Sequence, residues 1–517
     1  MRASVTLALL LVACGDSESK TPATTAPVDV PDVAPDAEVD ETIVEPPHPA
    51  TLAERGFQDV KVIAHLHSAY SHDACDGAGL DADGNPNAAC VARMKAALCQ
   101  EHIAVAFMTD HPGHMREYPF EPLLYAGAGD EVVRDGDGNA QSVRFACPTG
   151  QGGPDGKTTL FVGFEGNHTL GIGQLRHLDP LSDYSISFED ATSSADLDTV
   201  TAALRSAGGM VAIAHSEETD LSAETIRAHD VPAMELYNFH ANFKVVLGES
   251  LGEKFFELDP FLSKTAPPDP DLTALVLLDS YPEPALEKWR AVSAARRITA
   301  FAGSDVHENA SLPALCADES VCDGFNDTPN LKAALVTGGP VMMSDGDRLD
   351  SYARVFRWVN NRVSIPSDAS DIGAAVKASF EAGKNVVVFE VFGEAPGVAL
   401  VAEAGDAVVD MGGTTAPGAT LWARTPDAPA PDRVASWTDG SAAIVEGIVW
   451  RTDASGDHEV GRWTGASQWR SFAMSDGGSY HLEVRVTPLH LGQALGPAES
   501  MAHEAYRWVE TNAIRVE

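Results

Sequence analysis

Basic residues are scarce in this sequence of 517 residues. It has 35 lysines and arginines against 76 aspartates and glutamates, which gives a formal net charge of −41. A chain with this balance repels phosphate backbones, which excludes nucleic acid as a general partner, and it also excludes docking on anionic lipid through surface charge. The P-loop pattern is missing as well, which excludes the P-loop nucleotide hydrolases.

The N-terminal segment lacks the ~20 apolar residues that a membrane-spanning helix needs. Arg2 precedes a short apolar run over residues 5–13, a pattern typical of an export signal. The run ends in LVAC at residues 11–14, which resembles the cleavage box of bacterial lipoproteins. This resemblance implies a signal peptide over residues 1–14, a lipid on Cys14 and an exported bacterial lipoprotein anchored in a membrane, on the periplasmic face or at the cell surface. An ordinary signal peptide is the alternative.

Residues 15–50 contain no aromatic side chain that a core could bury. They hold nine acidic residues, one lysine and seven prolines, a composition that predicts a disordered, extended linker. Together with a lipid on Cys14, such a linker would hold a folded body away from the membrane.

Six cysteines follow Cys14, and an even number in an exported protein favours disulfides. They are Cys75, Cys90, Cys99, Cys147, Cys316 and Cys322. Six cysteines allow 15 pairings, and only Cys316–Cys322, which brackets a short loop, is predicted as a particular pair. Metal binding by this pair is the alternative, although its loop lacks CxxC spacing.

From about residue 57, strand-like and helix-like segments alternate. Apolar segments predict strands at 60–67, 103–111, 159–168, 210–215, 233–238 and 298–307, and helices are predicted at 90–100, 196–209, 222–231 and 284–297. This alternation predicts an α/β fold with a parallel sheet covered by helices, as a barrel or an open sheet. We assign residues 51–395 to this domain.

Short β-like stretches separated by Gly, Pro, Asp and Ser occupy residues 396–517. They predict a β-rich accessory domain that resembles a β-sandwich. Six of the eight tryptophans lie here, either as core and edge packing or as a platform for a ligand.

Histidines and carboxylates gather at the carboxyl ends of the predicted strands, which is where active sites of α/β barrels and sheets lie. His65 and His67 are two residues apart on a strand and therefore point to the same side. Imidazoles and carboxylates without cysteine favour divalent cations such as Zn, Mn or Fe. The segments are HLHSAYSHD, TDHPGH, VGFEGNH, AIAHS and AGSDVH.

The order of these segments resembles the polymerase-and-histidinol-phosphatase (PHP) superfamily of metallohydrolases over roughly residues 57–345. HxH is followed by an aspartate eight residues after its first histidine, then by TDH, a strand-end glutamate, an isolated histidine and DxH. The later segment AAVKASFEAGKNVVVFEVFG, which leads into β structure, is similar to the carbaryl-hydrolase-like branch. The resemblance implies a distorted seven-stranded β/α barrel and three divalent cations.

The resemblance also assigns ligands for these cations. The first would be held by His65, His67, Glu165 and Asp305. Glu165 would bridge to a second, completed by His215 and by either His168 or His177, with His168 favoured because HTLGIG follows from it. The third would be held by Asp73, His111 and His307, and His72 could compete with Asp73.

Catalytic roles are expected for Glu165, Asp305 and Asp110. Asp110 is expected to orient His111 rather than to bind a cation. Glu235, Asn238 and His240 end a strand near the site, where they serve either structural hydrogen bonding or substrate contact.

These expectations describe a metal-dependent hydrolase, most simply a phosphoesterase that attacks a small-molecule or envelope-derived ester with a metal-bound hydroxide. The same site acting on a carboxylic ester or carbamate is one alternative, and an inactive surface-binding module is another. An amidohydrolase also opens with HxH, but TDH and DxH fit that family less well. The substrate, the metal and the oligomeric state stay open.

Overall fold

The computed structural model describes residues 48–166, 168–179, 194–218, 221–242, 254–265, 267–278, 283–429 and 442–517. The predicted signal peptide, the lipidated Cys14, the linker up to residue 47 and Trp437 lie outside these residues. Within them, Pro49–Glu517 belong to one compact unit. None of the helices among the described residues has the length and hydropathy of a membrane span.

Seven strands make up the part of the sheet from which the predicted ligands come. They are β1 (Phe57–Leu66), β2 (Ile103–Met108), β5 (Lys157–Gly166), β6 (Thr169–Gln174), β7 (Met210–Ile213), β8 (Ala233–Asn238) and β9 (Thr299–Gly303). The pairs β1–β2, β2–β5, β7–β8 and β8–β9 are parallel, whereas β6 is antiparallel to β5 and β7. At the strand ends, Leu66 forms a parallel bridge with Val306, so the exit of β9 lies beside the end of β1.

The predicted α/β class is confirmed, but the prediction of a parallel sheet is wrong, because the sheet is mixed. Residues 159–168 were expected to form one strand with no strand directly after it. Only residues 167 and 168 separate β5 from β6. Parallel strands need a crossover of a dozen or more residues, so a connection this short permits only antiparallel pairing.

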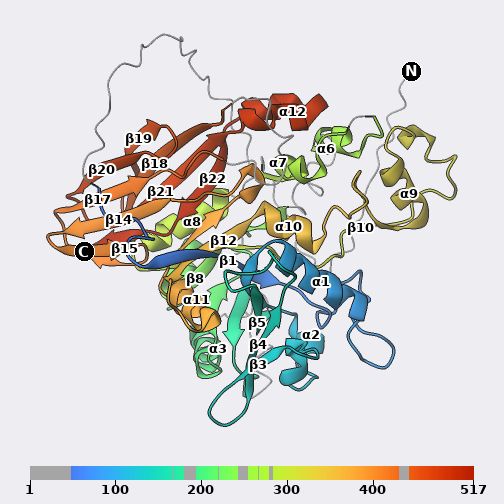
Figure 1. Cartoon of the computed structure of the whole chain (residues 1–517), viewed down its shortest axis with the longest axis horizontal. Helices are drawn as coiled ribbons and strands as arrows, with labels where there is room; N and C mark the ends of the chain where they lie inside the picture. Colours follow the sequence, from blue (N-terminus) through green and yellow to red (C-terminus); the bar gives the residue numbers. More distant parts are fainter. Residues whose placement is uncertain are drawn as a thin grey trace. The chain divides into compact units, whose positions relative to one another are not determined.

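The large sheet continues from β1 through strands that come later in the chain (Figure 1). In order of antiparallel pairing these are β12 (Asn360–Pro366), β13 (Asn385–Val388), β22 (Tyr506–Thr511), β21 (Gly478–Thr487), β18 (Ile444–Asp453) and β19 (Gly456–Thr464). Next to β5 lie β4 (Ala140–Ala146) and β3 (Glu131–Arg134), and next to β21 lie β23 (Ile514–Val516) and β16 (Thr414–Thr415). Hydrogen-bonded strands therefore join residues before and after position 395.

Two smaller sheets accompany the large one. One has the order β15 (Ala407–Asp410), β14 (Ala399–Ala404), β17 (Ala419–Arg424) and β20 (Trp469–Met474), and the other pairs β10 (Ser311–Leu312) with β11 (Gly339–Pro340). Trp422, Trp463, Trp469 and Trp508 are buried, so these four tryptophans serve packing and form no exposed platform.

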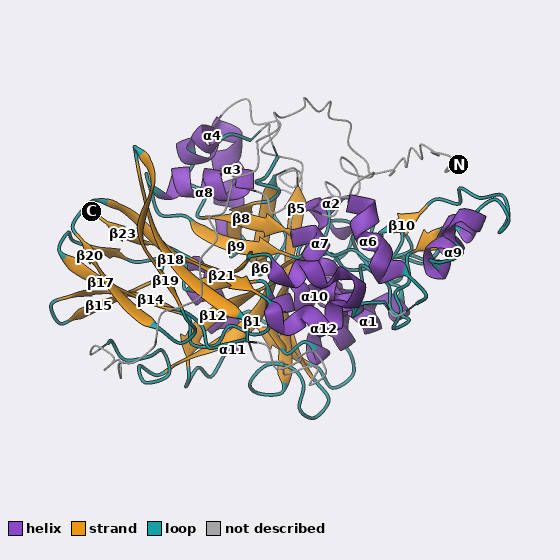
Figure 2. Cartoon of the chain, turned by 90° about the horizontal axis from the view of Figure 1, so that it is seen from above, coloured by secondary structure: helices purple, strands orange, loops and turns teal. Residues whose placement is uncertain are grey.

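Helices flank the sheets. They are α1 (Ala88–Gln100), α2 (Pro112–Met115), α3 (Ser194–Ser206), α4 (Ala223–Ala228), α6 (Lys254–Leu262), α7 (Ala274–Leu278), α8 (Glu283–Ser293), α9 (Pro329–Thr337), α10 (Tyr352–Trp358), α11 (Ile372–Glu381) and α12 (Gly492–Leu495). Short 3₁₀ segments are η1 (Glu121–Leu124), η3 (Pro270–Thr273), η4 (Asp323–Phe325), η5 (Glu390–Phe392), η7 (Leu489–Leu491) and η8 (Gly496–His503). Figure 2 shows α3, α4 and α8 together on one side of the strands and α1, α6, α7, α10 and α12 gathered on another.

Helix α1 illustrates how local sequence sets these elements. The side chain of Asn87 accepts hydrogen bonds from the N–H groups of Ala89 and Cys90, which caps the helix start. Buried Cys90, Met94 and Leu98 recur at intervals of four residues and form one apolar face. The helix ends at Gln100, as predicted, and begins two residues earlier than position 90.

One apolar cluster draws residues from all seven strands that lead to the ligands, and from α11. It includes Val62 and Ala64 of β1, Phe107 of β2, Phe161 of β5, Ile172 of β6, Ala212 of β7, Ala233 of β8, Phe301 of β9, and Val376 and Phe380 of α11. Burying each large side chain stabilises the fold by ~1.5–3 kcal/mol. Apolar packing therefore fixes the strands just before the positions where the candidate ligands follow.

Three asparagine side chains bond the edge of β9 that β8 does not cover. The Asn361 amide donates to the carbonyl of Ala302 at 2.9 Å and accepts from its N–H at 2.9 Å. Asn512 does the same for Ala300, at 3.0 and 2.7 Å, and Asn385 donates to the Ala300 carbonyl at 2.8 Å. Residues far apart in sequence thus complete the hydrogen bonding of the strand that leads to Asp305.

Three disulfides link Cys75 with Cys90, Cys99 with Cys147, and Cys316 with Cys322. The predicted Cys316–Cys322 pair is among them. The other two join positions separated by 15 and 48 residues, and no spacing rule in the sequence selects these pairs from the alternatives.

Candidate metal centre

Strand β1 delivers its two histidines into one buried place. His65 and His67 are both fully buried, and their Nε2 atoms lie 3.1 Å apart. Residues i and i+2 of a strand share a face, so the HxH spacing brings the two imidazoles together. Buried imidazoles need other polar groups beside them, because an unpaired polar group in the interior is costly.

Glu165 and Asp305 supply those groups. The Oε2 atom of Glu165 lies 3.4 Å from His65 Nε2 and 3.1 Å from His67 Nε2. The Oδ1 atom of Asp305 lies 3.2 Å from each of the same two nitrogens. We call His65, His67, Glu165 and Asp305 the HxH group. One ligand atom from each residue lies within 4.8 Å of the others, so the group could hold a cation.

A second set of ligands shares His67 and is called the Asp73 group: His67, Asp73, His111 and His307. The Oδ2 atom of Asp73 lies 3.3 Å from His307 Nε2 and 3.7 Å from His111 Nε2. The Nδ1–H of His307 donates to the Asp305 carbonyl at 2.8 Å. Because that carbonyl can only accept, His307 Nε2 keeps its lone pair and faces Asp73 as an available ligand.

A third set contains His215, Glu217 and Glu218 and is called the His215 group. His215 Nε2 lies 2.7 Å from Glu165 Oε1, and its Nδ1 lies 3.4 Å from Glu217 Oε1. The loop that carries the two glutamates is tied to α8, because Lys288 Nζ donates to the carbonyls of Ser216 and Glu218. The sequence prediction contained His215 but neither glutamate.

The two candidate histidines after Glu165 have different surroundings. His168 is buried, and its Nε2 lies 3.5 Å from Glu218 Oε2, beside the His215 group. His177 Nε2 donates to the Tyr118 carbonyl at 2.8 Å, and its ring packs edge-on against Phe120. The structure therefore brings His168 toward the centre and places His177 in a contact with the backbone. His72 is half exposed, with its ring 5.0 Å from that of His111.

Electrostatics bind the HxH group together. Burial opposes charge on His65 and His67, but the carboxylates of Asp305 and Glu165 outweigh burial, raising the pKa of His65 well above its usual value and that of His67 to about 9. Burial likewise disfavours charge on Glu165 and Asp305, yet the imidazoles hold the pKa of both carboxyls well below their usual values. Buried carboxylates in this arrangement require positive charge close by.

Three of the candidate ligands have backbone angles that non-glycine residues rarely adopt. His168, His215 and Asp305 have φ values of 50°, 49° and 49°. Left-handed backbone costs of order 1–3 kcal/mol at such a residue and persists only where the surrounding structure enforces it. Each of these residues stands just past a strand end, where the turn aims its side chain.

Glu235 orients two of the histidines. It is fully buried, its Oε1 lies 2.6 Å from His65 Nδ1, and its Oε2 accepts from the His215 N–H at 2.8 Å. Asn238 Nδ2 donates to the same Oε2 at 3.2 Å. A side chain on Gly303 would place its Cβ 1.8 Å from Glu235 Oε1, so only glycine leaves room for this carboxylate. These contacts favour the structural interpretation of Glu235 and Asn238.

Asp110 acts on a neighbouring loop. Its Oδ1 accepts from the Ser68 N–H at 2.5 Å and its Oδ2 from the Ser68 hydroxyl at 2.6 Å. Both oxygens thus hold the residue that follows HxH, rather than the ring of His111. Burial raises the pKa of Asp110 above its usual value. His111 is held instead through its backbone N–H, which donates to the Ser71 hydroxyl at 3.3 Å.

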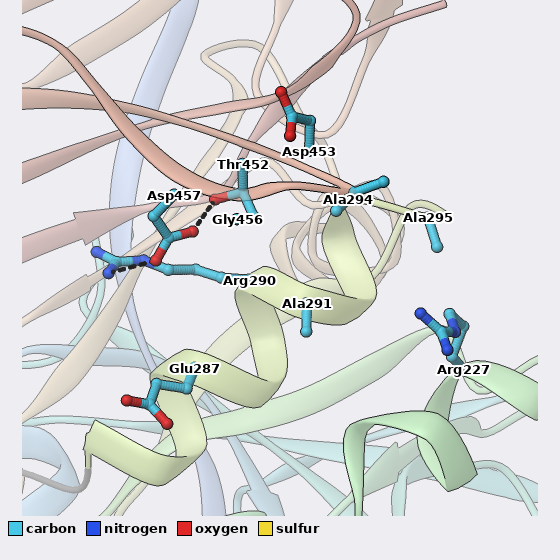
Figure 3. Close-up of a pocket in the computed structure, with 11 residues that line it drawn as sticks. Arg227, Glu287, Arg290, Ala291, Ala294, Ala295, Thr452, Asp453, Gly456 and Asp457 are labelled. Atoms are coloured by element: carbon cyan, nitrogen blue, oxygen red, sulfur yellow. Dashed lines mark hydrogen bonds and ion pairs between the residues drawn. The ribbon is translucent and has the colours of Figure 1, made fainter.

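A separate pocket of about 340 Å³ lies between α8 and the hairpin of β18 and β19 (Figure 3). Arg290 and Asp457 form an ion pair of 3.2 Å in its wall, and Arg227 and Glu287 also line it. The described residues that line this pocket include none of the candidate ligands, so it is distinct from the metal centre.

Comparison of the chain with protein-family models, with curated proteins and with solved structures finds no match. The functional interpretation therefore rests on the geometry of the site and on the resemblance in its motifs.

Proposed function

We propose that this protein is a hydrolase that depends on divalent cations and acts on a phosphoester. The observation that carries the proposal is the position of Glu165. Its Oε2 faces His65 and His67, and its Oε1 faces His215 at 2.7 Å. A carboxylate with one oxygen toward each of two imidazole groups is placed to bridge two cations, an arrangement typical of hydrolytic centres.

The unsatisfied atoms of the centre support bound cations. Asp305 Oδ1 and His307 Nε2 are buried and make no hydrogen bond within the described part of the chain. A buried acceptor without a partner costs ~1–3 kcal/mol, and a cation in the HxH group or the Asp73 group would remove that cost. The mixture of imidazole and carboxylate suits Zn, Mn or Fe.

We further propose that the seven strands form the distorted barrel that the PHP resemblance implies. Pairing runs without a break from β1 through β2, β5, β6, β7 and β8 to β9. The bridge from Leu66 to Val306 returns to β1, and one apolar cluster is shared by all seven strands. In this arrangement β9 and β1 meet only at their carboxyl ends, where His65 and Asp305 lie.

The side chains of the centre have separate roles. Bound cations would lower the pKa of a water to near neutrality and neutralise charge on the leaving oxygen. Glu165 and Asp305 would hold cations in the HxH group, and Glu235 fixes the ring of His65 so that its Nε2 faces these carboxylates. The ring of His240 lies 5.1 Å from that of His307, beside the Asp73 group, where a substrate would enter.

Metal analysis and a panel of hydrolase substrates test this function on protein that lacks residues 1–14. We expect divalent cations, three per chain, and hydrolysis of a phosphomonoester or phosphodiester that chelation abolishes. Protein that binds no divalent cation would leave the inactive binding module as the better interpretation. Hydrolysis of carboxylic esters or carbamates alone would assign the centre to the other substrate class.

We also propose that Cys14 carries a lipid and anchors the protein in a membrane. The disulfides support export to an oxidising compartment. Cell fractionation of the Cys14→Ser variant tests the anchor. We expect release into the soluble fraction, and a variant that stays in the membrane fraction would contradict lipidation.

A further inference from the structure

The segment over residues 68–79, called the Asp73 arm, is a loop that contributes one ligand to the centre. Asp73 is the only carboxylate in the Asp73 group as the described residues define it. Its side chain is 33% exposed, whereas His67, directly after β1, and His307, in the segment after β9, are buried. The group is therefore complete only when this loop, in which Ser71, Ala74 and Cys75 are buried, holds Asp73 in place.

The arm reaches the centre through a backbone that is costly to hold. Cys75 and Asp76 have φ values of 58° and 56°, so two consecutive residues with side chains adopt the left-handed region. Such conformations persist where contacts enforce them. The N–H groups of these residues donate to the carbonyls of His307 and Glu308, at 2.8 and 2.9 Å.

A covalent link fixes the same point. Cys75 lies two residues after Asp73 and forms a disulfide with Cys90 in the first turn of α1. Cys90 is buried, and α1 is fixed by its apolar face. The disulfide thus links the arm to α1 at Cys75, one of its two consecutive residues in the left-handed region. Arg348 also holds Asp76 through an ion pair at 2.8 Å.

We propose that Cys75 and Cys90 are positioning residues for the Asp73 group, which binds its cation tightly only when their disulfide is closed. The inference rests on the proposed function, since it assumes that the group holds a cation. Without the disulfide, the arm keeps its polar anchors but gains freedom at Cys75, and Asp73 spends less time within reach of His111 and His307. The first two cations would be held by the HxH group and His215, which contact the arm through Ser71, at 3.0 Å from His67 Nδ1, and not through Asp73 or Cys75.

Closing this bond has a defined redox balance. The thiols of Cys75 and Cys90 together lose two electrons and two protons as the S–S bond forms. An oxidised dithiol of a thiol–disulfide exchange partner accepts them, so its own disulfide breaks and it leaves as two thiols. The Asp73 group would therefore mature after export, in the compartment where such partners act.

Titration with Mn²⁺, followed by calorimetry and metal analysis, tests the inference on wild-type protein and on the Cys75→Ser/Cys90→Ser variant. We expect the variant to bind one cation about 10–100-fold more weakly, a range typical of losing a residue that orients a ligand, with the other cations unchanged. Asp73→Asn should weaken the same cation. Added to the double serine variant, Asp73→Asn should cause little further loss, because both changes act through one carboxylate.

The Cys316→Ser/Cys322→Ser variant is the matched control, since it also loses one disulfide. That disulfide lies beside α9, where the backbone N–H of Cys316 donates to the Leu335 carbonyl. The control should bind Mn²⁺ as the wild type does. A folded Cys75→Ser/Cys90→Ser variant with wild-type affinity for every cation overturns the inference, as does an equal loss in the control. If that variant does not fold, wild-type protein reduced natively at Cys75–Cys90, verified by mass mapping, replaces it under the same criterion. Wild-type protein that binds none of Mn²⁺, Zn²⁺ and Fe²⁺ refutes the proposed function itself.

Discussion

Replacing Glu165 by Gln is the most direct perturbation of the centre. The amide keeps the size of the side chain but removes the charge and one of the two acceptor oxygens. In the structure these oxygens lie 2.7 Å from His215 Nε2 and 3.1 Å from His67 Nε2. The substitution therefore affects the HxH group and His215 together, whereas Asp305, which also faces both, lies farther from His215 Nε2, at 3.7 Å.

The size of the effect follows from these two contacts. A hydrogen bond to a charged group contributes about 1.5–3 kcal/mol; because the amide loses one contact and leaves the other neutral, the total loss is at most roughly 3–6 kcal/mol. If the same interactions stabilise the transition state, kcat/KM falls by roughly 10²–10⁴-fold. We expect the fold to persist and two cations to bind more weakly, because one carboxylate serves both.

Metal analysis, circular dichroism and phosphoesterase assays on Glu165→Gln measure these three quantities. Glu287→Gln is the matched control, because it makes the same chemical change at an exposed position of α8. The control should retain wild-type activity and metal content. A Glu165→Gln protein with unchanged activity, or one that loses a single cation only, would refute the bridging role.

Three further predictions address the centre and a buried carboxyl on β22. Glu235→Gln should weaken cation binding about 10–100-fold while the fold persists, since it frees the ring of His65; unchanged Mn²⁺ affinity in a titration would contradict this. His307→Ala should lose one cation and keep more activity than Glu165→Gln, and loss of every cation by metal analysis would argue against separate groups. Burial and the neighbouring Glu483 raise the pKa of Glu510 to about 8, so folding stabilises its protonated form. This contribution to the free energy of unfolding is present below the ordinary glutamate pKa and is lost between about pH 4.5 and 8, by roughly 1 kcal/mol per pH unit. The Glu510→Gln variant should show a smaller dependence on pH in denaturant titrations. An unchanged dependence would assign it to other groups.

The sequence predicted the positions of the candidate ligands better than their partners. His65, His67, Glu165 and Asp305 were foreseen because side-chain alternation and strand ends place them at one edge, and the structure brings all four together. Glu235 was foreseen only as a polar residue near the site. Its bond to His65 depends on the register of β8 against β9 and on the space left by Gly303, neither of which a single strand reveals.

Other misses have equally physical causes. Strand β6 was not predicted, because its short alternation, Leu170 and Ile172 between small or polar residues, directly follows a strand end and is rich in glycine. Glu217 and Glu218 read as an ordinary solvated acidic pair until the loop after His215 is folded over Lys288. Two disulfides could not be predicted either, since pairing depends on which loops the sheet brings together.

The hydrogen bonds of Asn512 to β9 have a consequence for the order of folding. Synthesis and export deliver a chain from its N-terminus, and most of the candidate ligands emerge early. The N–H of Ala300, in the strand that leads to Asp305, donates to an amide oxygen more than two hundred positions later in the sequence, and Asn385 shares only the bond to the Ala300 carbonyl. Until that amide arrives, the strand has an open edge that competes for other partners. A chain interrupted before residue 512 would therefore carry every candidate ligand but lack the amide that bonds the backbone of Ala300.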